Sequence, residues 1–230
     1  GVGCARVDLL ETHISYVLLD GVHAYKIKKA IALEFLDFRT LAARRFYCDE
    51  ELRLNGRLAP ALYECVVPIT GSPDAPQLGG AGAALDYAVR MREFPQRMLL
   101  SAMLDRQEVD ERRIDELAAE VARFHGRIDV APPGSPYGDA QDALALALDN
   151  IDALLAARPD PAIAGTLDTL RRWTERTFAS IQSRLEARRR EGFVRECHGD
   201  LHLGNIAVVD GRIAIFDCID FNARMRWNDL

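Results

Sequence analysis

The stretch His198-Gly-Asp-Leu-His-Leu-Gly-Asn205, which a short apolar segment separates from Phe216-Asp217, decides the fold and the chemistry of this chain. It supplies two carboxylates and one carboxamide, on Asp200, Asp217 and Asn205. Carboxylate and carboxamide oxygens suit a hard cation such as magnesium, which also coordinates water and phosphate oxygens. A magnesium site beside a further aspartate is typical of phosphoryl-transfer sites, so these residues predict that class of reaction.

The apolar segment between the two parts of the motif has the pattern of a β-hairpin. Asp210-Gly211 is a dipeptide typical of a two-residue turn, and mostly apolar arms flank it on both sides. If these arms pair across the turn, Asn205 lies opposite Phe216. We therefore expect Asn205 and Asp217 at the same end of one hairpin, with Asp200 in the loop just before it.

The composition is that of an ordinary globular protein, with 49 % apolar and 28 % charged residues. The net charge of −6 argues against general nucleic-acid binding, which usually needs a basic surface. This charge suits a soluble enzyme and would not repel a cationic substrate. The 230 residues are enough to bury the core of one large domain or of two small lobes.

The five cysteines are odd in number and scattered, so we expect neither a disulfide framework nor a structural zinc site. No apolar run approaches the length that spans a membrane, and the N-terminus does not resemble a signal peptide. We expect a cytoplasmic protein with no nucleic-acid or membrane partner. Because the chain begins at Gly1 and stops soon after the motif, we also expect a fragment of a longer protein.

The first part of the chain has the patterns of a small sheet with one helix. Strands are predicted at residues 7–11, 14–19, 22–28, 62–69 and 84–91. Residues 37–57 predict a helix that begins at Thr40 or Asp37. Residues 71–82 are rich in Gly and Pro and predict a loop.

After Pro95 the pattern becomes helical. Apolar residues recur at helical intervals within 114–124, 144–155 and 167–185, and Trp173 is expected in the core. The junction near Pro95 divides the chain into an N-terminal nucleotide-binding lobe, residues 1–94, and a C-terminal catalytic and substrate lobe, residues 95–230. The predicted fold class is α+β: a small antiparallel sheet with one helix, followed by a larger, mainly helical lobe that carries the motif and its hairpin.

This order of elements and the 198–205 motif resemble the aminoglycoside phosphotransferase family, small-molecule kinases with a bilobal, protein-kinase-like fold. The likeness is closer still to the phosphotransferase-like module of bacterial bifunctional proteins that join it to a P-loop ATPase module. The residues that carry the resemblance span nearly the whole chain: Glu11-Thr-His-Ile-Ser15, Phe35-Leu-Asp-Phe38, Glu51-Leu-Arg-Leu-Asn-Gly-Arg-Leu-Ala-Pro60, the 198–205 motif and Phe216-Asp-Cys-Ile-Asp-Phe221. No Gly-x-x-x-x-Gly-Lys-[Ser/Thr] occurs, so the ATPase partner module would lie outside this chain.

The resemblance implies ATP and magnesium, with a small-molecule hydroxyl as the phosphate acceptor. Asp200 matches the catalytic aspartate that accepts the proton of the attacking hydroxyl. Asn205 and Asp217 match the two residues that bind magnesium. Because negative charge spreads over the transferred phosphoryl group, positioning and neutralisation by cations matter more than covalent chemistry.

The family also uses a strand lysine that contacts the α- and β-phosphates. Tyr25-Lys-Ile-Lys-Lys29 offers three lysines, of which alternation places Lys26 and Lys28 on one face of a strand. Lys29 is expected on the opposite face or beyond the end of the strand. Lys26 is preferred because it lies in mid-strand between an aromatic residue and an isoleucine, and Lys28 stays open.

Two further nucleotide contacts follow from the resemblance. A helix glutamate fixes the strand lysine, and Glu51 is preferred for this role over Glu50. The backbone near Glu93 and Phe94 would hold the adenine ring. These expectations complete the predicted cofactor site.

Three features depart from the family pattern. Thr12-His-Ile-Ser15 stands where many kinases have a glycine-rich loop. Asp220 follows the metal-binding aspartate closely and is either a further ligand or an exposed carboxylate. The helices expected after Asp217 are missing from the chain, so the substrate pocket is expected to be incomplete.

Two other functions stay open. A non-catalytic kinase-like module could bind nucleotide and regulate a partner, and the absence of a glycine-rich loop motivates this alternative. A metal-dependent hydrolase is the other alternative, because His198-x-Asp200-x-His202 with Asp217 offers nitrogen and oxygen ligands to a transition metal.

Overall fold

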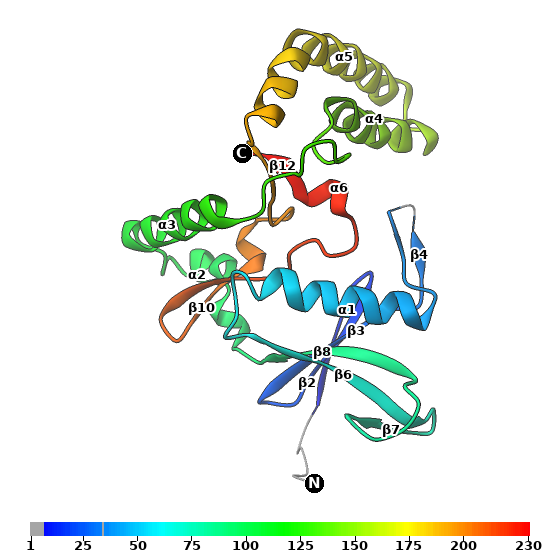
Figure 1. Ribbon diagram of the computed structural model, residues 1–230, viewed down its shortest axis with the longest axis vertical. Helices are drawn as coiled ribbons and strands as arrows, with labels where there is room; N and C mark the ends of the chain where they lie inside the picture. Colours follow the sequence, from blue (N-terminus) through cyan, green and yellow to red (C-terminus); the bar gives the residue numbers. More distant parts are fainter. Residues whose placement is uncertain (1–6, 34) are drawn as a thin grey trace. The chain divides into compact units, whose positions relative to one another are not determined.

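The structure is a computed structural model that describes residues 7–33 and 35–230, and the chain forms two compact units (Figure 1). The first unit comprises the chain up to Gly126 together with His198–Asn222. The second comprises Arg127–Cys197 together with Ala223–Leu230. The motif therefore belongs to the same unit as the N-terminal sheet. The lobe boundary predicted after residue 94 falls inside this unit, and the functional division into two lobes stays a prediction.

The first unit contains an antiparallel sheet of six strands in the order β1-β2-β3-β8-β6-β7. In chain order these strands are β1 (Asp8–Glu11), β2 (Ser15–Leu19), β3 (His23–Lys28), β6 (Tyr63–Ser72), β7 (Ala75–Leu78) and β8 (Asp86–Arg92). The sequence predicts all of them except β7. In the register, Lys26 lies between Val17 on β2 and Val89 on β8, in the middle of the sheet.

The loop predicted at residues 71–82 is wrong in part. β6 runs on to Ser72, and β7 pairs with it across a turn at Pro73-Asp74. Pro76 is tolerated in β7 because this strand lies at the edge of the sheet, where no further strand needs its missing N–H. The density of Gly and Pro marks the turn correctly but conceals the strand that follows it.

The helix α1 (Leu41–Asn55) lies across the sheet, against β6 and β8 (Figure 1). Of the two predicted starts Thr40 is correct: its side-chain oxygen accepts a hydrogen bond from the amide of Ala43 at 3.1 Å. The predicted range 37–57 is too long at both ends. Before the helix, two short strands pair with each other, β4 (Ala32–Leu33) and β5 (Leu36–Asp37).

The first unit continues after β8 with short helices and the predicted hairpin. Its elements are η1 (Gln96–Met98), α2 (Leu100–Asp105), α3 (Glu111–Arg127), η2 (Leu203–Asn205), β10 (Ile206–Val209) and β11 (Arg212–Ile215). β10 and β11 pair in the predicted register, with Ile206 opposite Ile215. Asp210 and Gly211 have φ of 50° and 78°, as a tight two-residue turn with positive φ at both positions requires.

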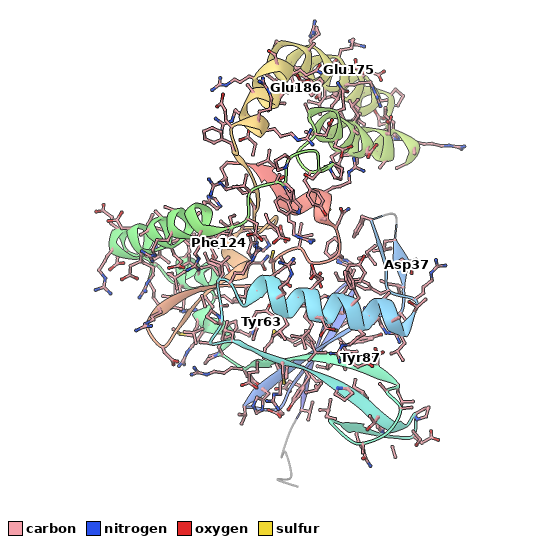
Figure 2. The ribbon with its side chains drawn as sticks, in the orientation of Figure 1. Asp37, Tyr63, Tyr87, Phe124, Glu175 and Glu186 are labelled. Atoms are coloured by element: carbon pink, nitrogen blue, oxygen red, sulfur yellow. The ribbon has the colours of Figure 1, made fainter. Side chains whose placement is uncertain are left out.

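One hydrophobic cluster joins α1, the sheet and the hairpin. Tyr63, which begins β6 beneath α1 (Figure 2), belongs to this cluster, and Phe94 and Phe216 pack against it with ring centroids 5.5 Å apart. The hairpin that carries the motif is therefore anchored on the core of the sheet. The buried members of the cluster are Cys48, Ala59, Leu62, Tyr63, Val89 and Ala214.

The second unit is mainly helical, and α4 and α5 pack side by side (Figure 1). Its elements are α4 (Ala140–Ala156), α5 (Pro161–Arg190), β9 (Val194–Glu196), α6 (Ala223–Arg226) and β12 (Trp227–Asp229), with β9 paired to β12. Trp173, predicted in the core, is 56 % exposed because it lies on the outer side of α5. After Asp217 the chain contains a single helix, the four-residue α6.

Two predictions from composition bear on the described part of the chain. Within the described residues, Cys48, Cys65, Cys197 and Cys218 form no disulfide, and Cys4 lies outside these residues. Among the helices within residues 7–33 and 35–230, none combines the length and the apolar character that crossing a membrane would require.

Replacing Thr40 with Ala should lower the free energy of unfolding by about 1 kcal/mol, because Ala cannot accept the hydrogen bond that caps α1. Thr40→Ser keeps the hydroxyl and should stay within about 0.5 kcal/mol of the original protein. Urea denaturation of both variants measures the difference. Equal losses in the two variants would show that the cap does not hold the helix.

Candidate active site

The end of the hairpin places Asn205 and Asp217 as predicted. The amide of Phe216 donates to the carbonyl of Asn205 at 2.9 Å, so pairing continues one residue beyond β10 and β11. Asp217 follows with φ of 61°, a left-handed conformation that non-glycine residues seldom adopt and that is often found at functional sites. This conformation is held by neighbours: the amide of Asp217 donates to the Tyr63 hydroxyl at 3.3 Å.

Lys26 on β3 joins Asp217 to α1. Its ammonium lies 2.5 Å from Asp217 Oδ1 and 2.8 Å from Glu51 Oε1. Glu51 is 1 % exposed, so this carboxylate is held inside the unit between the sheet and the helix. Lys26, Glu51 and Asp217, whose roles are all implied by the family resemblance, thus form one chain of ion pairs.

The other two lysines of the strand lie elsewhere. Lys28 shares the face of Lys26, as predicted, but is 2 % exposed and donates to Glu51 Oε2 at 2.8 Å and to Asp220 Oδ2. Lys29 lies on the other side and donates to Glu11 and to the carbonyl of Thr12. Only Lys26 among the three lines the cavity described below.

The acidic alternatives are also separated by the structure. Glu50, the alternative to Glu51, pairs with Arg53 on the exposed side of α1. Asp220 was expected to be a metal ligand or an exposed carboxylate. It is 6 % exposed and pairs with Lys28, so the expectation of an exposed carboxylate is wrong. The side chain is buried because Lys28, which comes from the middle of the sheet, needs a second buried partner.

Burial and charge oppose each other in this cluster. Burial alone would lower the pKa of Lys26, but Asp217 and Glu51 outweigh it and hold the pKa well above its ordinary value. The pKa of Lys28 is raised in the same way, against burial, by Glu51 and Asp220. Burial would raise the pKa of Glu51, yet the two ammonium groups lower it overall, so Lys26, Lys28 and Glu51 are all charged at neutral pH.

Asp220 differs from Glu51 in how burial and neighbouring charges combine to set its pKa. Burial raises its pKa and outweighs the opposing effect of Lys28, while the negative charge of Glu51 raises the pKa further. Its carboxylate is nevertheless hydrogen-bonded to Lys28. The carboxyl group of Asp220 is therefore harder to ionise in this cluster than that of Glu51.

His198 organises the loop before the hairpin. Its Nε2 lies 2.9 Å from the carbonyl of Phe216, and its Nδ1 accepts from the amide of Asp200 at 3.3 Å. Burial lowers the pKa of His198, in agreement with a neutral ring that donates through Nε2. Both ring nitrogens are therefore occupied, which removes the ligand that the metal-dependent hydrolase requires. Within residues 7–33 and 35–230, no group of three or more His, Cys, Asp or Glu side chains is arranged to hold a metal.

Asn205 connects Asp200 to the cavity. Its amide nitrogen donates to the carbonyl of Asp200 at 3.0 Å and to Asp200 Oδ2 at 3.3 Å, which leaves the amide oxygen as an acceptor. Asn205 and Asp217 both line the cavity, and Asp217 is 47 % exposed. One carboxamide and one carboxylate oxygen beside open space fit the ligand preference of magnesium. Asp200 itself is about half exposed, and His202 Nε2 lies 3.6 Å from its Oδ2.

A cavity of about 230 Å³ lies at the centre of the site. One part of its lining is apolar and comes from Val17, Leu19, Ala24, Leu62, Met91 and Phe94. The polar lining includes Lys26, Asn205 and Asp217, together with Thr12, Tyr63, Arg92, Glu93 and Gln96. Because ligand sites usually measure about 300–1,000 Å³, a molecule of nucleotide size would fill this cavity and extend beyond it.

Glu93 and Phe94 both line the cavity, but the Glu93 amide is engaged. It donates to the carbonyl of Val22 at 2.9 Å, and the Glu93 side chain accepts from the amide of Gly21. An adenine ring at this position would therefore need other backbone groups, such as the Glu93 carbonyl.

Two residues of the site, Asn55 and Tyr63, were assigned no role from the sequence, and the pairing of Lys28 with Asp220 was not predicted. Asn55 lies one helical turn after Glu51; its amide nitrogen donates to the Glu51 carbonyl, and its oxygen accepts from the amide of Cys218 at 2.8 Å. The interval between Glu51 and Asn55 is a signal that could have identified Asn55. Tyr63 and Asp220 carry no such local signal, because their partners are distant in sequence.

Comparison with known proteins identifies the family. The model of the phosphotransferase enzyme family matches residues 40–230, and the chain belongs to this family. Membership implies a protein-kinase-like fold and phosphotransferase chemistry, which confirms the coarser part of the resemblance seen in the sequence. The narrower resemblance, to a module joined to a P-loop ATPase, stays a prediction.

Curated relatives cover the same region. Uncharacterized proteins from two strains of Mycobacterium tuberculosis and from Mycobacterium bovis are each 29 % identical to the chain over 226 residues. The match covers 97 % of the chain but 43 % of each relative. The chain therefore spans less than half the length of these relatives.

Replacing Glu51 with Gln should lower the free energy of unfolding at neutral pH by about 3–5 kcal/mol, because two buried ammonium groups lose the carboxylate between them. The pH dependence should change as well. The pKa of folded Glu51 lies below its ordinary value of 4.5, so its contribution is present above pH 4.5 and lost as the pH falls further. The variant should lack that loss in urea unfolding measured between about pH 7 and pH 3.

Glu50→Gln is the matched control for Glu51→Gln. It removes a carboxylate of the same helix whose partner, Arg53, is on the surface, so its cost should stay below about 1 kcal/mol. Similar losses in the two variants would contradict the assignment of Glu51 as the buried centre of the site.

Proposed function

We propose that the chain binds magnesium and ATP and transfers the γ-phosphoryl group to a hydroxyl of a small molecule. The observation that carries this proposal is the convergence of Lys26, Asn205 and Asp217, from β3 and from the hairpin, on one partly apolar cavity. The family supplies the class of reaction, phosphotransfer.

The nucleotide is proposed to lie with its base against the apolar part of the cavity and its phosphates toward Lys26. Ala24, Leu62 and Met91 offer the flat apolar contacts that an adenine ring needs. Lys26 is only partly exposed, at 13 % of its side chain, and directs its ammonium to the polar end of the cavity. An ammonium at this position would neutralise the charge of the α- and β-phosphates.

Asn205 and Asp217 would hold magnesium, which supplies charge neutralisation at the phosphate oxygens when it is bound. The donor set supports this assignment because the amide orientation of Asn205 leaves its oxygen free to coordinate. In the absence of a metal, Lys26 compensates the charge of Asp217. The ion pair thus holds the carboxylate in place before the ion arrives.

Asp200 is proposed as the base. Its carboxylate is about half exposed, so a hydroxyl can reach it, and Asn205 and His202 lie beside the same oxygen, Oδ2. The acceptor oxygen would form a bond to the γ-phosphorus as the bond from phosphorus to the β–γ bridging oxygen breaks. The hydroxyl proton would pass to Asp200, and the leaving group would be ADP.

The whole protein is proposed to contain a further module. Relatives are more than twice as long as the part that matches, which leaves room for the P-loop ATPase predicted from the resemblance. The phosphate acceptor is proposed to be a small molecule.

Asp217→Asn should weaken binding of Mg–ATP at least about tenfold, because it removes the charge that holds the metal and pairs with Lys26. Isothermal titration calorimetry with and without magnesium gives the affinity. Asp210→Asn is the matched control: it too replaces an aspartate at positive φ, here 50°, and Asp210 pairs with Arg92 on the surface. Equal affinities in the two variants would remove Asp217 from the metal site.

Asp200→Asn should reduce phosphoryl transfer by about 10²–10⁴-fold while the affinity for Mg–ATP stays within about threefold, since the base acts on the acceptor. ADP release by the full-length protein, over a panel of hydroxyl compounds, measures turnover. Asp210→Asn again serves as the control. Unchanged turnover in Asp200→Asn would refute the base, and nucleotide binding without turnover would favour a regulatory module.

A further inference from the structure

A second ion pair lies behind the Lys26–Glu51 contact and takes no part in the proposed reaction. Lys28 and Asp220 are 2 % and 6 % exposed, and neither lines the cavity. Two buried charges away from a ligand are costly to desolvate, so their presence needs a reason. We propose that Lys28, anchored by Asp220, is a positioning residue that keeps Glu51 charged and in place while Lys26 exchanges Asp217 for phosphate; this inference rests on the proposed function.

Lys26 divides its contacts unequally between two carboxylates. It donates a hydrogen bond to Asp217 Oδ1. Glu51 Oε1 lies 2.8 Å from the same ammonium, yet this buried oxygen accepts no aligned hydrogen bond from any described residue. Lys26 therefore attracts Glu51 by charge but directs its hydrogen bond to the metal-binding aspartate.

Nucleotide binding would change the partners of Lys26. When Asp217 takes up a metal and phosphates enter, the ammonium of Lys26 must turn toward phosphate oxygens. A glutamate held by Lys26 alone would then be a buried carboxylate with a shared, weakened partner. Such a group would protonate or move, and Lys26 would lose the support that aims it.

Lys28 supplies what Lys26 cannot. It donates an aligned hydrogen bond of 2.8 Å to Glu51 Oε2, and its ammonium lies 5.1 Å from the centre of the Phe38 ring, which is fully buried. Its partner Asp220 belongs to the segment that begins with Asp217, whose backbone is fixed to α1 through Asn55. Glu51 is thus held from the side away from the cavity, by atoms that nucleotide binding leaves in place.

The test separates positioning from simple stability by removing the pair together. Lys28→Met should lower the melting temperature, because Glu51 keeps only Lys26 and the buried carboxylate of Asp220 loses the ammonium of Lys28. Adding Asp220→Leu removes that buried carboxylate and should restore most of the stability. Mg–ATP affinity, measured by calorimetry on the full-length protein, should nevertheless stay at least about tenfold weaker than in the original protein. Recovery of both stability and affinity would overturn the proposal.

Arg44 and Asp86 provide a matched control pair. Their ion pair also joins α1 to the sheet but contacts neither Glu51 nor the cavity. Arg44→Met with Asp86→Leu should leave Mg–ATP affinity within about twofold. A tenfold loss in this control would show that any ion pair between α1 and the sheet has the same effect, which also overturns the proposal.

A second comparison serves if Lys28→Met with Asp220→Leu does not fold. Glu51→Gln and the combination of Glu51→Gln with Lys28→Met differ only in Lys28, and the combination removes one charge of each sign. If Lys28 acts through Glu51, the two proteins should bind Mg–ATP equally within about twofold. A further tenfold loss on removing Lys28 would mean that it acts by another route and would refute the positioning role.

The original protein is titrated first, so that the two proposals fail in different ways. If it binds no Mg–ATP, the proposed function fails, and the inference is decided by crystal structures of the original protein and of the protein with Lys28→Met and Asp220→Leu. Movement of Lys26 from Asp217 to Glu51 in the variant supports the positioning role. Unchanged positions of Lys26 and Glu51 overturn it.

Discussion

The buried carboxylate of Glu51, shared between Lys26 and Lys28, is the interaction on which the first unit depends. A carboxylate that is 1 % exposed is unfavourable unless cations stay within contact distance. Because the two cations come from β3 and the carboxylate from α1, the helix has one favourable placement on the sheet. Asp217 and Asp220 add the segment after the hairpin to the same cluster. The same ion pairs therefore determine both the geometry of the site and the packing of the unit.

The charge balance of the cluster also suits the proposed chemistry. Two ammonium groups face three carboxylates, so an added divalent cation is favoured at the exposed carboxylate, Asp217. Lys26 contacts that carboxylate in the structure, and in the proposed function its ammonium would turn toward the phosphates. The left-handed backbone of Asp217 is maintained by Tyr63 and by the neighbouring bond to Asn55. The carboxylate is thus preorganised, which lowers the cost of binding.

The sequence predicts those parts of the site that depend on local pattern. The Asp-Gly turn fixes the hairpin register, and with it the positions of Asn205 and Asp217. Alternation along β3 correctly places Lys26 and Lys28 on one face, whereas Lys29 lies beyond the end of the strand. The edge strand β7 was missed because its Gly- and Pro-rich surroundings carry no strand pattern. The burial of Asp220 was missed because its partner is distant in sequence, and burial of a carboxylate follows only from tertiary contacts.

The alternation of Lys26 and Lys28 has a consequence for the tolerance of β3 to changes in length. Side chains of a strand point to opposite faces in turn, so an insertion or deletion of one residue between these lysines would rotate one ammonium to the far side of the sheet. Glu51 would then contact one ammonium group instead of two. The cavity would lose its positive charge if Lys26 were displaced, and the buried cluster would lose one if Lys28 were displaced. The effect of a point substitution can be compensated by changes at neighbouring positions. The effect of a one-residue insertion or deletion within this strand cannot. The number of residues in β3 is therefore as restricted as their chemical type.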